Sequence, residues 1–421
     1  MRLFCTGDLH IGRRSSSSPD DSKEHYCAEA WLRAVDSAIE EKADVVLLSG
    51  DVINKDNQFF EAAGPLEAGL KKLAEQNIHV CTVAGNHDFY ALPQFLKGQS
   101  GEYIHLLGEG GRWEDVTIER NGEKLRVFGW SFPTEWHAQN PLSDLQVDRS
   151  GIPTVGLLHC DIDSSDTRYV PVPLRDLKNR NEICFWLTGH IHAPRCYNDA
   201  GTPVLNPGSL QAMDLGETGD HGPWMVDING GLVSEPRQLK TSTVKYCRFD
   251  IDVTGWEAAK LKTKIISEIL NRSSEAKKDT GAKIVSARVN ITGTTDAQNE
   301  INDIRSQLKN SHLSDVHIDK LNISVAPTID LHSLAQGKGA KAVAARLLLS
   351  IEGGTFAQDH PKLLKDAEKQ MISAYKSTAY ELVKKDITDS PDDDLPNPAD
   401  AIAVIKAQCL QLLNKMMEAD S

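Results

Sequence analysis

The sequence predicts an α/β protein with a small second α/β domain and a helical C-terminal region. Short apolar runs alternate with helix-like stretches over residues 1–240, a β-α-β-β pattern occupies 241–330, and helical periodicity dominates 331–421. At 421 residues the chain is too long for one ordinary core. We therefore expect these three regions to correspond to domains.

The first region begins as a sheet whose strands are buried on both faces. Strand-like runs occur at 3–6, 45–48, 78–83, 125–130, 154–158 and 183–187. Helix-like stretches at 28–41 and 62–76 separate the first three of them. A hairpin is predicted where 224–228 and 232–233 flank Asn229-Gly230-Gly231, because these residues favour a tight turn. This order is typical of a sheet covered by helices.

The second and third regions follow different patterns. Strands are expected at 245–253, 283–291 and 316–325, and helices at 257–270 and 297–309. Beyond them, helices are expected at 340–349 and 361–385. An acidic, proline-containing break at 388–396 precedes a last helix, which we expect to begin after Asn397 because Pro398 and Asp400 complete a start signal.

The last helix carries an apolar stripe whose partner the sequence leaves open. The stripe comprises Ile402, Ile405, Cys409, Leu412 and Met416. Such a stripe packs either on its own domain or on another protein.

Composition excludes several classes of protein. Charged residues make up 25% of the chain and apolar residues 40%, with no apolar run long enough to span a membrane. The net charge of −14 argues against a protein that coats polyanions by bulk attraction. The eight cysteines form no C-x-x-C pair. We therefore expect a cytoplasmic protein with reduced thiols and no membrane segment.

Five strand-like runs end on small residues followed by metal-binding side chains. The motifs are Gly7-Asp8-Leu9-His10, Ser49-Gly50-Asp51, Gly85-Asn86-His87-Asp88, His159, and Gly189-His190-Ile191-His192. Ligands commonly sit beyond strand ends in layered α/β folds, where loops converge while the sheet holds their roots. One D-x-H motif alone is weak evidence, but five motifs of this kind indicate a single site.

The types of side chain indicate which ions the site would bind. Carboxylate, amide and imidazole ligands suit divalent manganese, iron or similar ions better than a thiolate zinc cage. Seven ligands exceed the need of one ion, so they suit two ions bridged by one carboxylate. Ligands at i and i+2 point the same way on an extended segment. Gly7, Gly50, Gly85 and Gly189 each precede a candidate ligand, where we expect a sharp turn or a close approach of strands.

These motifs, in this order, resemble the calcineurin-like metallophosphoesterase superfamily. The resemblance extends from Met1 to about Leu239 and ends with Asn206-Pro207-Gly208-Ser209, a turn that relatives carry after the last ligand motif. It implies an αββα sandwich of two sheets. The layout of the remaining chain resembles the SbcD-type nuclease subunit of bacterial SbcCD and its archaeal and eukaryotic counterparts in double-strand-break repair. By that resemblance, residues 241–330 are a capping domain.

The resemblance also implies roles for the residues of the site. Asp8, His10, Asp51 and His192 would hold one metal ion, and Asp51, Asn86, His159 and His190 the other. The expected ions are Mn²⁺, with iron, magnesium or zinc as alternatives. His87 would act beside the scissile phosphate as a general acid or charge stabiliser, with Asp88 orienting it.

The implied activity is metal-dependent hydrolysis of DNA phosphodiesters together with a separate SbcC-like ATPase. The C-terminal helices are the expected docking surface for that ATPase. Arg13 and Arg14 follow the first motif and are candidate contacts to DNA phosphates, or simply solvated. Some nuclease relatives carry a second catalytic histidine where this chain has Asn54, which cannot transfer a proton.

Several alternatives stay open at this stage. The same metal chemistry would serve a phosphatase or phosphodiesterase for small nucleotides or phosphoproteins. A largely structural clamp for DNA ends is a second alternative. Endonuclease against exonuclease action, and the formation of a homodimer, are also open.

Overall fold

The computed structural model describes residues 1–16, 22–55, 59–99, 101–148, 150–164, 167–308, 312–328, 330–375 and 397–418. The expected acidic break at 388–396, and the part of the expected 361–385 helix beyond residue 375, lie outside the described residues.

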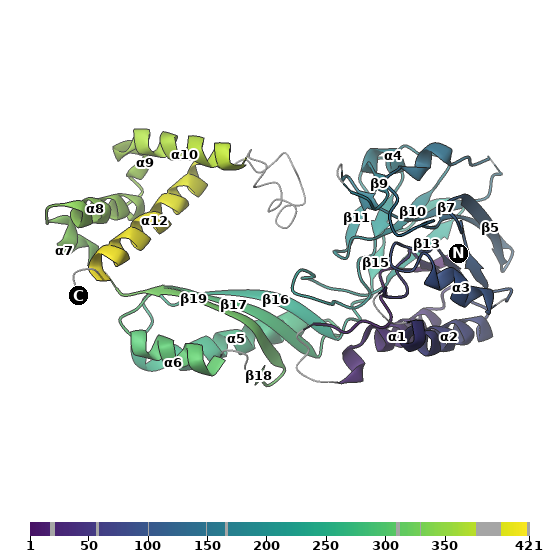
Figure 1. Cartoon of the computed structure of the whole chain (residues 1–421), viewed down its shortest axis with the longest axis horizontal. Coiled ribbons are helices and arrows are strands. Elements are labelled where there is room, and N and C mark those ends of the chain that lie inside the picture. Colours follow the sequence, from purple (N-terminus) through teal and green to yellow (C-terminus); the bar gives the residue numbers. More distant parts are fainter. Residues whose placement is uncertain are drawn as a thin grey trace. The chain divides into compact units, whose positions relative to one another are not determined.

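The described part of the N-terminal region contains a seven-stranded sheet that includes the first three expected strands (Figure 1). Its order is β14-β13-β1-β2-β3-β4, with β15 paired to β13. β1 to β4 are parallel, and β13 runs antiparallel to β1. The bounds are β1 Arg2–Thr6, β2 Val45–Leu48, β3 His79–Thr82, β4 Ile104–Leu106, β13 Trp224–Asn229, β14 Leu232–Val233 and β15 Arg237–Gln238.

A second sheet, six-stranded within the described residues, has the order β11-β12-β10-β7-β6-β5. β6, β7, β10 and β12 are parallel, while β5 and β11 pair antiparallel at the edges. The bounds are β5 Trp113–Arg120, β6 Glu123–Trp130, β7 Thr154–His159, β10 Phe185–Gly189, β11 Arg195–Tyr197 and β12 Val204–Asn206. The short strands β8 (Asp161–Ile162) and β9 (Pro171–Val172) pair with each other.

Alternation of side chains along the strands packs these two sheets together. Leu3 and Cys5 of β1 share a buried cluster with Leu157 and Phe185 of the second sheet. Phe4, between them, points the other way because successive side chains of a strand face opposite sides. Each fully buried side chain of this size stabilises the fold by about 1.5–3 kcal/mol.

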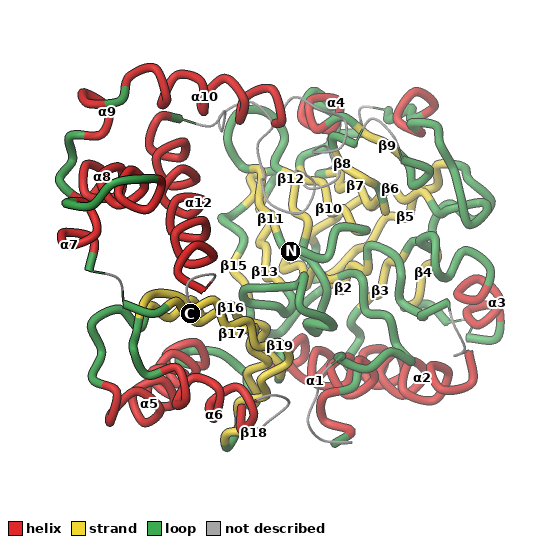
Figure 2. Tube along the Cα trace, turned by 60° about the vertical axis from the view of Figure 1, so that its left-hand side comes forward, coloured by secondary structure: helices red, strands yellow, loops and turns green. Residues whose placement is uncertain are grey.

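Helices cover the outer faces of both sheets (Figures 1 and 2). Trp31 of α1 and Leu70 of α2 pack against Phe4 and its neighbours, and Leu177 of α4 packs with Trp186 of β10. The layers therefore run helix, sheet, sheet, helix, which confirms the expected sandwich. The helices of this region are α1 Cys27–Glu40, α2 Phe59–Glu75, α3 Ala91–Lys97 and α4 Leu174–Lys178, with short 3-10 turns at η1 Lys23–His25 and η2 Pro141–Asp144.

A four-stranded sheet of the described residues follows, in the order β16-β17-β19-β18. Its elements are β16 Val244–Asp252, η3 Ala258–Lys260, α5 Leu261–Lys277, β17 Ile284–Thr294, α6 Gln298–Leu308, β18 His312–Leu313 and β19 Val316–Ala326. The expected strands and helices of this region are thus present, with β18 added.

The C-terminal elements are helical, as expected. They are α7 Leu331–Ala335, α8 Ala340–Glu352, α9 Phe356–Asp359, α10 Pro361–Tyr375 and α12 Pro398–Glu418. α12 begins where the sequence predicts, because Asn397 Oδ1 accepts hydrogen bonds from the backbone N–H groups of Ala399 (2.8 Å) and Asp400 (3.2 Å).

The stripe of α12 is only partly buried. Ala344 and Leu348 of α8 share a buried cluster with Leu413 of α12. Leu413, which is outside the expected stripe, is fully buried, whereas Leu412 of the stripe is 53% exposed.

The chain divides into two compact units. The first comprises Met1–Phe249, Ile266–Val289 and Gln307–Asn322, and the second comprises Asp250–Ile265, Asn290–Ser306 and Ile323–Ser421. The units interleave because the long strands β16, β17 and β19 contribute residues to both. The expected domain boundaries at 240 and 330 stay a prediction. None of the described helices has the length and apolar character that crossing a membrane requires.

Candidate metal centre

The candidate ligands converge at the carboxyl ends of five parallel strands. Asp8 and His10 follow β1, Asp51 follows β2 and Asn86 follows β3, while His159 ends β7 and both His190 and His192 follow β10. Asp8, His10, Asp51, Asn86 and His159 are buried. The convergence follows from the fold, because parallel strands present their carboxyl ends at the same edge.

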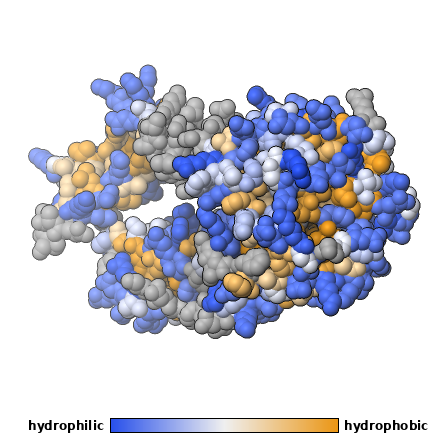
Figure 3. Space-filling view, turned by 45° about the vertical axis from the view of Figure 1, so that its right-hand side comes forward, coloured by the Kyte–Doolittle hydropathy of each residue, from blue (hydrophilic) through white to orange (hydrophobic). Residues whose placement is uncertain are grey.

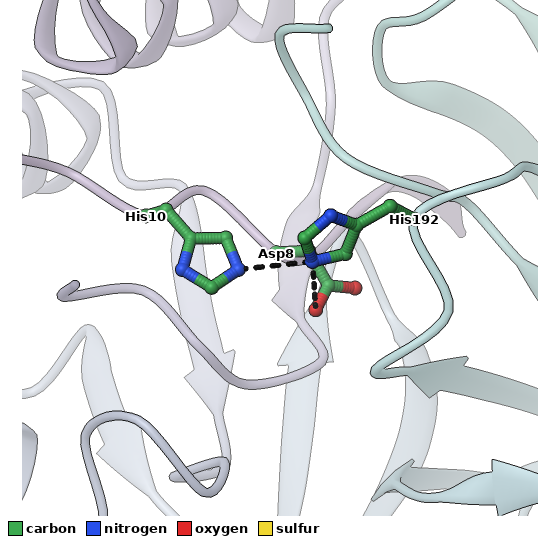
Figure 4. Close-up of side chains that lie close together, drawn as sticks. All are labelled: Asp8, His10 and His192. Atoms are coloured by element: carbon green, nitrogen blue, oxygen red, sulfur yellow. Dashed lines mark hydrogen bonds and ion pairs between the residues drawn. The ribbon is translucent and has the colours of Figure 1, made fainter. Parts of the chain in front are cut away.

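The first group of these side chains gathers around His192. The Nε2 atoms of His10 and His192 lie 3.1 Å apart (Figure 4). His192 Nε2 is 3.9 Å from Asp8 Oδ1, and His10 Nε2 is 3.9 Å from Asp51 Oδ2.

The second group gathers around Asn86. Asn86 Oδ1 lies 3.1 Å from His159 Nε2 and 3.2 Å from His190 Nδ1. His159 Nε2 is also 3.3 Å from Asp51 Oδ2. Asp51 Oδ2 therefore faces a histidine of each group, which is the position that a bridging carboxylate requires.

The residues present fit divalent cations. The two groups offer carboxylate oxygens, one amide oxygen and imidazole nitrogens, a donor set that suits manganese, iron or zinc. The carboxylate and amide oxygens and the imidazole nitrogens with free lone pairs lie close together in both groups. Cations bound between these atoms would remove the electrostatic repulsion among them.

Four of these residues have backbone conformations that side chains rarely adopt. The φ angles are 47° at Asp8, 44° at His10, 47° at Asp51 and 88° at His190. Such conformations cost about 1–3 kcal/mol each and cluster at functional sites. Hydrogen bonds between the loops hold them, including Asp8 N to Gly50 O (3.1 Å) and His10 N to Asp51 O (2.9 Å).

Glycines make room for this crowding. A Cβ atom on Gly85 would lie 2.2 Å from Asp51 Oδ1, and one on Gly50, where φ is +96°, would lie 2.7 Å from His159 Nδ1. The expectation that a glycine before a ligand marks a turn or a close approach is confirmed at both positions.

Burial and neighbouring charges set the protonation of the cluster. Burial lowers the pKa of His10 and of His190 to about 3. Burial by itself would lower the pKa of His159 as well, but the nearby Asp51 carboxylate raises it above its ordinary value. His10 and His190 are therefore neutral, which is the form that binds metals, whereas an ion bound by His159 would displace a proton from its ring.

The loop after β3 also carries His87 and Asp88. The backbone N–H of His87 donates to Asp51 Oδ1 (2.8 Å), and its ring lies 4.8 Å from the ring of His10. Asp88 accepts backbone hydrogen bonds from Gly85 (2.7 Å), Val52 (2.7 Å) and Ile53 (3.1 Å). Asp88 thus joins the loops after β2 and β3. Its expected role in orienting His87 stays a prediction.

Comparison with known families identifies this arrangement. Residues 1–194 match the family model described as calcineurin-like phosphoesterase. The N-terminal region is a calcineurin-like metallophosphoesterase domain. This confirms the resemblance drawn from the five motifs.

Curated proteins are similar to this chain over part of their length. The uncharacterized metallophosphoesterase YhaO of Bacillus subtilis is 25% identical over 222 residues, covering 52% of this chain and 54% of that protein. The DNA double-strand break repair protein Mre11 of Archaeoglobus fulgidus is 25% identical over 239 residues, covering 52% of each chain. The chain therefore spans about half the length of these two curated relatives. Among solved structures, TT1561 of Thermus thermophilus has 14% identity and a TM-score of 0.38, covering 56% of this chain and 98% of that one.

The two candidate DNA contacts, Arg13 and Arg14, have different surroundings. Arg13 Nη2 pairs with Asp214 Oδ2 at 3.1 Å, and both side chains are partly exposed. Arg14 is exposed, with its guanidinium 4.6 Å from the centre of the Tyr26 ring. Asn54 is buried, and its backbone N–H donates to Ile11 O (3.1 Å).

Glu217 belongs to the site although no motif of the sequence indicates it. Its Oε1 lies 2.8 Å from His192 Nδ1, on the side of the ring away from the candidate ligands. Glu217 sits in an irregular loop with no periodic pattern, so no sequence signal marked it. The Asn206-Pro207-Gly208-Ser209 turn was the nearest available signal, because Ser209 Oγ donates to Glu217 Oε2 (2.7 Å).

The close approach at Gly85 gives a testable prediction. Gly85→Ala is expected to reduce the free energy of unfolding by about 1–3 kcal/mol, because the added methyl group collides with Asp51. Gly64→Ala in α2 is the matched control, since a Cβ atom there meets nothing within 4 Å. Urea denaturation of both variants measures the difference. Equal stability of the two variants would contradict the crowding described here.

Proposed function

We propose that the chain is a two-metal-dependent phosphodiesterase that cleaves DNA. The observation that carries the proposal is the position of Asp51 between two groups of candidate ligands. In this proposal Asp8, His10, Asp51 and His192 hold one ion, and Asp51, Asn86, His159 and His190 hold the other. Mn²⁺ is the proposed ion, because the oxygen and imidazole donors suit it.

The residues of the chain divide the work between binding and proton transfer. When bound, two divalent cations polarise the phosphate and lower the pKa of water. His87 lies beside the ring of His10, 4.8 Å between ring centres, without belonging to either proposed ligand set. In the proposal, its imidazole stabilises charge on the phosphate or donates a proton to the leaving oxygen. Asp88 holds the loop of His87 against the loop of Asp51 through its backbone hydrogen bonds.

DNA is the proposed substrate because Mre11, a double-strand break repair protein by name, is among the similar proteins. Arg13 and Arg14 lie directly after the first ligand motif and would contact the phosphate backbone. Asn54 stands where some nuclease relatives have a catalytic histidine, so the proposal leaves the balance of endonuclease and exonuclease action open.

A separate SbcC-like ATPase is the proposed partner, and α8, α10 and α12 the proposed docking surface. Val343 of α8, Leu363 of α10 and Leu412 of α12 are 50%, 41% and 53% exposed. The visible face of the C-terminal helices carries apolar side chains among charged ones (Figure 3). Capture of an ATPase by the intact chain would support this part of the proposal. A cytoplasmic location is part of the same proposal.

His87→Ala tests the proposed catalysis. Cleavage of linear duplex or single-stranded DNA with Mn²⁺ is expected to fall at least about 100-fold, because acid–base catalysis contributes on that scale. Metal content and DNA binding should stay near wild type, because His87 belongs to neither proposed ligand set. The same assay on cyclic dinucleotides and phosphopeptides tests the rival substrates. Activity of the wild-type protein on small substrates alone would reject the nuclease, and full activity of the variant would reject the role of His87.

Removing single ligands tests the proposed sharing of Asp51. His192→Ala is expected to lose one of two bound ions, whereas Asp51→Ala is expected to lose both. Elemental analysis after dialysis against Mn²⁺ counts the ions per chain. Asp227→Ala is the matched control. Asp227 of β13 pairs with Arg2 of β1, away from the strand ends that carry the site. Equal losses in the Asp51 and His192 variants would argue against a bridging carboxylate.

Arg13→Ala tests the proposed contact with the DNA backbone. The slope of the logarithm of DNA affinity against the logarithm of salt concentration should fall in magnitude by about 0.9. Binding is measured in chelator, so that no cleavage occurs. Arg2→Ala is the control, because Arg2 has a similar ion pair with Asp227 (3.2 Å) at the opposite end of β1. An unchanged slope for Arg13→Ala would exclude a phosphate contact.

A further inference from the structure

We propose that Glu217 is a positioning residue for the metal centre: its carboxylate holds His192 with Nε2 directed at Asp8 and His10. This inference rests on the proposed function in so far as His192 is a ligand. It adds a residue outside the five motifs.

The hydrogen bond between Glu217 and His192 determines which nitrogen of the neutral His192 ring carries the proton. A neutral imidazole carries one N–H group and one lone pair. Because Glu217 Oε1 accepts at 2.8 Å from Nδ1, the proton of His192 belongs on Nδ1. The lone pair then lies on Nε2, which is 3.1 Å from His10 Nε2 and 3.9 Å from Asp8 Oδ1. Carboxylates behind ligand histidines orient metal sites in this way.

Glu217 is itself held in place. It is only 5% exposed, and its Oε2 accepts from Ser209 Oγ (2.7 Å) and from the backbone N–H of Met213 (2.9 Å). Ser209 in turn lies 3.0 Å from His221 Nδ1. These hydrogen bonds, together with the one to His192, fix the direction of the buried Glu217 carboxylate.

The loop that carries Glu217, residues 206–221, also holds the backbone of His192. The N–H of Ser209 donates to His192 O (3.0 Å). Asn206 Nδ2 donates to Ile191 O (2.7 Å) and Ala193 O (2.8 Å), on either side of His192. Loop 206–221 therefore fixes both the main chain and the ring of this residue.

His192 needs such support because its side chain is less buried than those of other proposed ligands. The side chain of His192 is 27% exposed, whereas those of His10 and His159 are 1% and 0% exposed. Packing restrains the two buried rings, and His159 Nδ1 also bonds Ser49 O (2.9 Å). At the more open side of the site, a charge-assisted hydrogen bond replaces that packing.

Binding of Mn²⁺ alone, measured by calorimetry on the full chain, tests the inference. Glu217→Ala is expected to weaken one of the two sites about 10–100-fold. Glu217→Gln should weaken it less, because the amide oxygen still accepts from Nδ1. Asp220→Asn is the matched control, because Asp220 lies in the same loop and pairs with Lys240 and Lys245 instead of His192. Its affinity for Mn²⁺ is expected to match that of wild type.

Nitrogen-15 NMR of the metal-free protein supplies a readout that does not depend on metal or activity. The His192 ring should carry its proton on Nδ1 in wild type and in Glu217→Gln, and lose this preference in Glu217→Ala. If Glu217→Ala fails to fold, Glu217→Gln still tests the inference through its expected smaller loss of Mn²⁺ affinity. Wild-type affinity at both sites in the folded Glu217 variants, or a neutral wild-type His192 ring with its proton on Nε2 instead of Nδ1, would overturn the inference. Absence of Mn²⁺ binding by wild type would instead overturn the proposed function.

Discussion

The structure of the site depends on one buried carboxylate, Asp51, which faces imidazoles from both sheets. Its Oδ2 lies 3.9 Å from His10 Nε2 and 3.3 Å from His159 Nε2. Burial by itself would raise the pKa of Asp51, but His159 and the neighbouring histidines lower it below its ordinary range. A buried charge of this kind is tolerated only when partners compensate it. The site therefore forms only when the two sheets are packed on each other as described.

This arrangement requires backbone conformations that are unfavourable in free energy. Asp8, His10 and Asp51 are held at positive φ, and Gly50 and Gly85 leave no space for a side chain. These conformations oppose folding locally, and the packed sheets and the hydrogen bonds between loops hold them. Asp88 contributes by accepting backbone hydrogen bonds from both loops that border Asp51. The stability of the sandwich thus supports the crowding that the proposed chemistry needs.

Loop 206–221 links the proposed centre to its surroundings. Glu217 reaches His192, and Asp214 of the same loop pairs with Arg13 next to the first ligand motif. Tyr246 of β16 donates to Met213 O (3.0 Å), so the strand that leads into the rest of the chain also braces this loop. One loop therefore restrains a proposed ligand and a proposed DNA contact together.

The sequence by itself determined the strands that carry the five motifs, the motifs themselves and the start of α12, and tertiary structure decided the rest. Strand ends and caps are local, since apolar periodicity and residues such as Asn397 act over a few positions. The approach of Asp8 and Asn86 was also predictable, because parallel strands of one sheet bring their carboxyl ends to one edge, whereas His190 joins them through the packing of the second sheet on the first. Three features were not predictable from the sequence: the contact of Glu217 with His192, the backbone partners of Asp88, and the burial of Leu413 instead of Leu412. They depend on how irregular loops and helix faces meet in space, and no periodic pattern in the chain encodes that meeting.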